Sequence, residues 1–214
     1  MAETERLRIF NENYEPVGTA SRNEVHREGL WHETFHCWFY TVDQEELTIY
    51  FQKRSLDKKD FPGMLDISAA GHLLEDEEVL DGFREVKEEL GIDVSAVDAE
   101  SLGVFIVEIH LDGFIDHEFT NVFLVKKQLN EGDFFLQEEE VEGIFPVKLT
   151  QLKEIFYGTV ETVTLDGVCQ SKNRQFFDRQ TFRKSDFCAN AYTYYDRLIH
   201  SFEKILENER KTLD

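Results

Sequence analysis

The segment GHLLEDEEVLDGFREVKEELGI, residues 71 to 92, carries the clearest pattern in the chain. Drawn as an α-helix with about 100° per residue, it gathers apolar residues on one side: Val79, Phe83, Val86 and Leu90. Roughly 140° away around the same helix lie three carboxylates: Glu85, Glu88 and Glu89. The pattern predicts a helix that buries one face and presents a separate carboxylate face.

The carboxylate face invites two interpretations. Like charges three or four residues apart destabilise a helix by about 0.2–0.5 kcal/mol per pair, so a bound cation would stabilise it. Hard oxygen ligands suit Mg²⁺ or Mn²⁺, and Arg84 could hold one carboxylate by a bidentate contact. From the carboxylates alone, a solvated acidic helix is an equally good interpretation, because the chain contains 44 Asp and Glu residues.

The order of these residues resembles the box that defines the Nudix family, G-x5-E-x7-R-E-U-x-E-E-x-G-U, where U is aliphatic. The matching positions are Gly71, Glu77, Arg84, Glu85, Val86, Glu88, Glu89, Gly91 and Ile92. Six residues, not seven, separate Glu77 from Arg84, which puts the role of Glu77 in more doubt than the R-E-x-x-E-E core. The resemblance implies metal-dependent hydrolysis of a diphosphate linkage in a small molecule such as a nucleoside diphosphate linked to a second group. It assigns Mg²⁺ or Mn²⁺ to Glu85, Glu88 and Glu89, with Arg84 as their organiser.

The same resemblance implies the fold, an α/β/α sandwich around a mixed sheet. It covers roughly residues 6 to 155, and we expect one domain over residues 1 to 214 with a helical C-terminal extension from residue 156. Alternating and β-branched runs predict strands at 7–10, 16–22, 33–42, 46–54, 101–111 and 117–127, and a further strand at the start of the segment 141–158. Helical spacing predicts a short helix ending at Gly158 and a long one over residues 189 to 211.

A second resemblance concerns isopentenyl diphosphate isomerase, a Nudix relative that moves a double bond without hydrolysing the diphosphate. It rests on EVHREGLWHETFHCWFY, KRSLDKKDFPGMLDISAAGH and IDHEFTNVF. The resemblance implies a metal site with an acid from His26, His32, His72, Asp116 and Glu118, and diphosphate binding by Arg54 and Lys58. The isomerase needs a cysteine just before the Gly-His pair, where this chain has Ala70. That departure and the intact R-E-x-x-E-E core favour hydrolysis, with the isomerase and a non-catalytic Nudix ligand sensor as alternatives.

Other polar residues have weaker patterns. The general base of a hydrolase could be Glu88 or Glu89, or Glu139 or Glu140 in the segment QEEEVEG. The remaining histidines are expected to be packed or solvent-facing residues: His36, His110, His117 and His200.

Composition limits the partners. A net charge of −21 repels polyphosphate backbones, so we expect no nucleic-acid binding, and phosphate chemistry requires metal and local cations. Three widely spaced cysteines argue against a disulfide framework and favour a reducing cytoplasm. No signal-like or membrane-spanning stretch is evident, so a soluble protein is expected. Dimers are common in families of this type, and the sequence leaves a homodimer open.

Overall fold

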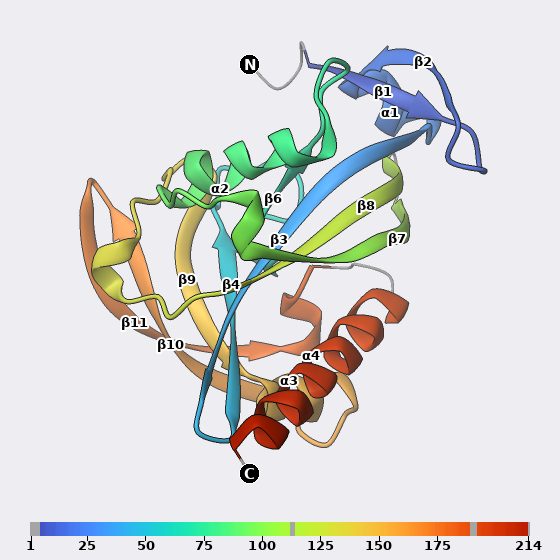
Figure 1. Cartoon of the computed structure of the whole chain (residues 1–214). Coiled ribbons are helices and arrows are strands. Elements are labelled where there is room, and N and C mark those ends of the chain that lie inside the picture. The colour runs from blue at the N-terminus through green and yellow to red at the C-terminus, as the bar shows by residue number, and fades with distance from the viewer. Residues whose placement is uncertain (1–4, 112–113, 189–191, 214) are drawn as a thin grey trace.

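The computed structural model describes residues 5–111, 114–188 and 192–213 (Figure 1). Its helices are α1 (Arg22–Glu28), α2 (Phe83–Leu90), α3 (Leu149–Phe156) and α4 (Tyr192–Leu213). Its strands are β1 (Arg6–Phe10), β2 (Pro16–Ser21), β3 (Trp31–Asp43), β4 (Glu46–Arg54), β5 (Leu65–Asp66), β6 (Ala69–His72), β7 (Ala99–Leu111), β8 (Phe114–Lys126), β9 (Val141–Lys148), β10 (Thr162–Ser171) and β11 (Arg174–Arg183).

One mixed sheet organises the fold, with β3 at its centre. The main path runs β11-β10-β9-β4-β3-β1-β2, and β6, β7 and β8 branch from it. β3 pairs in parallel with β8, from Trp31 opposite His117 to Tyr40 opposite Lys126, and antiparallel with β1, β4 and β6. Because β3 is 13 residues long, its first half reaches β1 and β6 while its second half reaches β4.

Helices cover both faces of this sheet, as the sandwich prediction requires (Figure 1). Along β3, Phe35 and Phe39 pack in the apolar cluster that includes α2, whereas Trp38 packs in the cluster that includes α3 and α4. Such alternation is what a strand buried on both faces demands, since successive side chains point to opposite sides. The α/β/α architecture with an added C-terminal helix is therefore confirmed.

The C-terminal region differs from the expected helical extension. Residues Thr162–Ser171 and Arg174–Arg183 form the β10–β11 hairpin, and β10 joins the sheet through β9. Alternation explains the strand, because Val163 and Leu165 are buried between exposed neighbours. Lys172 and Asn173 close the hairpin with φ of 52° and 59°, the left-handed backbone typical of a tight hairpin turn.

Only the last helix of that region was expected, and it forms. α4 packs an apolar face against the sheet, with Leu198, Ile199 and Phe202 fully buried and Ile205 and Leu206 partly buried. The first residues of the predicted helix, 189 to 191, lie outside the described residues.

Candidate active site

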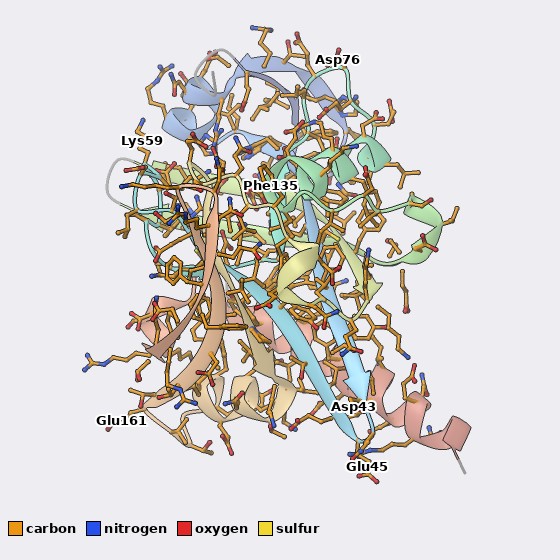
Figure 2. All side chains as sticks on the ribbon, turned by 90° about the vertical axis from the view of Figure 1, so that its left-hand side faces the viewer. Asp43, Glu45, Lys59, Asp76, Phe135 and Glu161 are labelled. Carbon is orange, nitrogen blue, oxygen red and sulfur yellow. The ribbon has the colours of Figure 1, made fainter. Side chains whose placement is uncertain are left out.

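The box segment folds as a strand, a loop and a short helix. Gly71 and His72 end β6, a single 3-10 turn covers Val79–Gly82, and α2 follows from Phe83 to Leu90. Gly91 ends the helix with φ 72°, donating its N–H to the Lys87 carbonyl at 3.0 Å. In Figure 2, Asp76 of this loop and Lys59 lie in the upper half of the molecule, whereas Asp43 and Glu45 of the β3–β4 turn lie at the opposite end.

Glycine is required at position 71 because the backbone of β6 passes close to the Glu85 side chain. A Cβ placed on Gly71 would lie 2.0 Å from Oε1 of Glu85, far inside van der Waals contact. Glycine at this position therefore lets β6 run against the carboxylate of α2.

Arg84 gathers the acidic side chains. One guanidinium nitrogen donates to Glu85 at 2.6 Å and to Glu88 at 3.3 Å. The others contact both carboxylate oxygens of Glu77, the second at 3.0 Å, and the His72 carbonyl at 3.1 Å. The shortened spacing before Arg84 thus does not separate it from Glu77, which also accepts the Leu74 N–H at 2.9 Å.

The carboxylates of α2 differ in their exposure. Glu89 is buried, and its Oε2 accepts from the Ala70 N–H at 3.1 Å and from Gln52 at 3.4 Å. Burial, and then the nearby Glu85, raise the pKa of Glu89 well above its usual value. Burial also raises the pKa of Glu85 to about 7, although Arg84 opposes the shift. Burial removes water from these clustered carboxylates, and the neighbouring cations do not fully balance their negative charge. A divalent metal ion would supply the missing positive charge.

Gln52 is a site residue that the sequence analysis missed. It is buried on β4, donates to Glu89, and its Oε1 has no hydrogen-bond partner. Strand alternation is the sequence pattern that could have identified Gln52. Tyr50 and Gln52 share one face of β4, and Tyr50 packs in the α2 cluster.

A second polar cluster brings together residues distant in sequence. α1, β3 and β6 each supply one histidine, and β8 supplies two acids: His26, His32, His72, Asp116 and Glu118. The Nε2 atoms of His26 and His72 are 3.3 Å apart. Oδ1 of Asp116 lies 3.6 Å from Nε2 of His26 and 3.5 Å from Nε2 of His32.

The electrostatics of this cluster also favour a cation. The Nδ1 atoms of His26 and His32 face backbone carbonyls at 2.9 and 3.0 Å, so each Nδ1 carries the proton and each Nε2 offers a lone pair. Nε2 of His32 and Oδ1 of Asp116 are buried without a hydrogen-bond partner. Burial lowers the pKa of His32 to about 3 and raises that of Asp116 to about 7. Neutral imidazoles around such a carboxylate are a suitable donor set for a divalent ion.

The predicted phosphate-binding cations are both in ion pairs. Arg54 donates to Asp66 at 2.7 Å and to the Asp60 carbonyl at 3.1 Å. Lys58 forms an ion pair with Glu140. Burial and Glu85 raise the pKa of Glu89 and the Ala70 N–H lowers it; to a smaller extent the charge of Lys58 lowers this pKa and that of Glu140 raises it. Lys58 and Glu140 therefore belong to the surroundings of the α2 carboxylates.

The position that resembles the isomerase cysteine is Ala70 on β6, whose N–H contacts Glu89. The three cysteines are free and buried. Cys37 lies opposite Ala69 on the neighbouring strand and packs in the apolar α2 cluster, where burial raises its pKa. Its thiol is therefore held in an apolar environment that disfavours the thiolate.

The family of this protein is shown by its similarity to known sequences. The NUDIX domain family model matches residues 30–163, and the chain belongs to this family of diphosphate hydrolases, which generally use divalent metals. An uncharacterised Nudix hydrolase of Clostridium acetobutylicum is 34% identical over 200 residues, covering 93% of this chain and 97% of that protein.

Two further similarities concern the branch and the fold. An isopentenyl-diphosphate Delta-isomerase of Kocuria rhizophila is 30% identical over 127 residues, 56% of this chain and 66% of that protein. The DR0079 crystal structure from Deinococcus radiodurans matches with a TM-score of 0.55 and 22% identity, covering 72% of this chain and 90% of that one, which shows the shared fold. Among the described residues, no helix is long and apolar enough to cross a membrane.

Proposed function

We propose that this protein hydrolyses the diphosphate linkage of a nucleoside diphosphate joined to a second group, using Mg²⁺ or Mn²⁺ held by Glu85, Glu88 and Glu89. The observation that carries the proposal is the position of Arg84, which contacts Glu77, Glu85 and Glu88 at once. Three oxygen donors fixed on one short helix suit hard divalent ions.

The roles of the side chains follow from their contacts. Arg84 orients Glu85 and Glu88, and the Ala70 N–H orients Glu89. A divalent ion bound there would supply neutralisation of phosphate oxygens and activation of water. Glu140 or a carboxylate of α2 accepts the proton of the attacking water. Lys58 binds phosphate by exchanging its partner Glu140 for the substrate, and Arg54, which is paired with Asp66, is the second phosphate-binding cation.

We propose that a second divalent-metal centre is formed by the five-residue cluster of His26, His32, His72, Asp116 and Glu118. Its partnerless Nε2 of His32 and Oδ1 of Asp116 support this assignment. The cluster also favours isopentenyl diphosphate isomerisation as a second candidate function. Against this function, Ala70 occupies the position where the isomerase needs a cysteine. Three free cysteines support a cytoplasmic location.

The test is phosphate release from a panel of nucleotide-linked and isoprenoid diphosphates, with Mg²⁺ or Mn²⁺ and with EDTA. We expect metal-dependent release from a nucleotide-linked class, and loss of release in Glu88→Gln and Glu89→Gln. Both variants must keep the far-ultraviolet circular dichroism of the wild type. Full activity in either folded variant would exclude the proposed site.

The isomerase alternative is tested in deuterated water. Incubation with isopentenyl diphosphate followed by mass spectrometry reports carbon-bound deuterium, which only proton exchange at carbon produces. Deuterium uptake without phosphate release would replace the hydrolase proposal with the isomerase.

A further inference from the structure

The β7–β8 ribbon carries a third polar cluster, formed by Glu108, His110 and His117. Glu108 lies directly opposite His117 in the antiparallel pairing, and His110 lies opposite Ile115. Residues of one strand alternate between faces, so these three side chains point away from the face that carries Asp116 and Glu118. The cluster is therefore separate from the five-residue centre of His26, His32, His72, Asp116 and Glu118.

We propose that Glu108, His110 and His117 form a binding site for a transition-metal ion of the zinc class. The Nε2 atoms of His110 and His117 are 3.2 Å apart. Two imidazole nitrogens bound to one tetrahedral ion through bonds of about 2.0–2.1 Å would lie about 3.3 Å apart. A carboxylate oxygen of Glu108 and one ring nitrogen of each histidine all lie within 4.8 Å of one another, so one ion can reach all three groups.

His117 is held in the orientation that a metal ligand needs. Its Nδ1 lies 2.8 Å from the Gly29 carbonyl, which can only accept, so Nδ1 carries the proton and Nε2 presents its lone pair toward His110. Trp31 stacks on its ring with a centroid distance of 5.0 Å. Gly29 adopts φ 64° after α1, and a Cβ there would lie 2.6 Å from Ile115. This tight turn keeps the carbonyl against His117.

The other two ligands leave the site open to solvent. Glu108 and His110 are exposed, and His117 is partly buried. Two neutral imidazoles and one carboxylate are typical zinc donors, and Glu108 reduces the charge that the ion brings to the surface. The oxygen-only carboxylates of α2 prefer harder ions, so Zn²⁺ distinguishes the two kinds of site.

The test compares Zn²⁺ binding by equilibrium dialysis, in excess Mg²⁺, between the wild type and His110→Asn or His117→Asn. Asparagine at position 117 can still donate to the Gly29 carbonyl but lacks the Nε2 ligand. We expect each variant to lose one equivalent of bound Zn²⁺, with affinity at this site lower by at least about 100-fold, since outer-shell losses alone cost about 10–100-fold. His200→Asn, at an exposed histidine of α4, should bind as the wild type does.

A residue-resolved readout separates this site from the five-residue centre. Zn²⁺ should shift the ¹⁵N resonances of Nε2 in His110 and His117, and hydrolysis in Mg²⁺ should stay unchanged in His110→Asn. Unchanged Zn²⁺ stoichiometry in both folded variants, with no shift of these resonances, would reduce the contact to a simple hydrogen bond between two histidines and overturn the proposal. The Zn²⁺ stoichiometry and the resonance shifts can be measured whether or not the protein has the proposed hydrolase activity.

Discussion

Arg84 contacts both carboxylate oxygens of Glu77, although one residue fewer separates them than in the usual Nudix box. The chain between them forms a loop and a 3-10 turn before α2 begins at Phe83. The shortened segment therefore still returns Glu77 to the guanidinium, and Glu77 anchors the residue that orients Glu85 and Glu88.

This anchoring predicts a graded loss of activity. Arg84→Ala should lower kcat/KM by roughly 100-fold, because small misplacements of catalytic groups cost about that factor. Glu77→Gln should cost less, since the amide keeps one acceptor for Arg84. Steady-state kinetics in Mg²⁺ give both values, with Glu75→Gln as the control, because Glu75 pairs with Arg6 outside the site. A Glu77→Gln loss equal to that of Arg84→Ala would instead give Glu77 a direct role.

The contact between Gly71 and Glu85 predicts that Gly71→Ala is damaging. A Cβ at 2.0 Å from Oε1 must displace either β6 or the Glu85 side chain. We expect a stability loss of about 1–3 kcal/mol by urea unfolding, as for other overpacked positions, together with weakened metal dependence. Gly132→Ala is the matched control, because a Cβ there meets nothing within 4 Å. Equal effects at the two positions would show that the close approach is unimportant.

The pKa of Glu85 predicts how stability of the metal-free protein changes with pH. The folded state raises this pKa to about 7 from 4.5, so it holds the proton more tightly than the unfolded state does. The contribution to the free energy of unfolding is thus full below the unfolded pKa and is lost as pH rises through about 7. Urea unfolding in EDTA between about pH 5 and pH 8 should show this loss for the wild type, and a smaller one for Glu85→Gln. Identical pH slopes in the two proteins would contradict the shift.

The five-residue centre predicts metal-dependent stabilisation. Mn²⁺ at about 100 times its Kd should raise the free energy of unfolding by about 2.7 kcal/mol. Thermal unfolding with Mn²⁺ and after chelation measures this effect. Asp116→Asn should lose the share that comes from the five-residue centre, because Oδ1 of Asp116 faces both His26 and His32, and should keep the share that comes from the α2 carboxylates. His200→Asn should respond as the wild type. A full Mn²⁺ response in Asp116→Asn would argue that the metal binds elsewhere.

Local patterns in the sequence predicted much of the fold. The apolar stripe of Val79, Phe83, Val86 and Leu90 predicted α2, and the last three are buried on that helix. Val79 lies instead in the 3-10 turn before it, partly buried against the same cluster. Alternation gave the β1–β2 and β3–β4 hairpins. The β10–β11 hairpin was not predicted, although Val163 and Leu165 alternate with polar residues in the same way.

The sequence by itself determined the α2 carboxylate face, because residues three and four apart on a helix are neighbours in any fold. Only the tertiary structure decided which distant residues meet. Pairing of β3 with β8 brings His32 beside Glu118. Pairing of β4 with β9 likewise brings the loop of Lys58 to Glu140, and pairing of β7 with β8 brings His110 to His117. His110 and His117 each looked like an isolated histidine, since strand register, which sets such contacts, depends on long-range pairing that a local pattern does not contain.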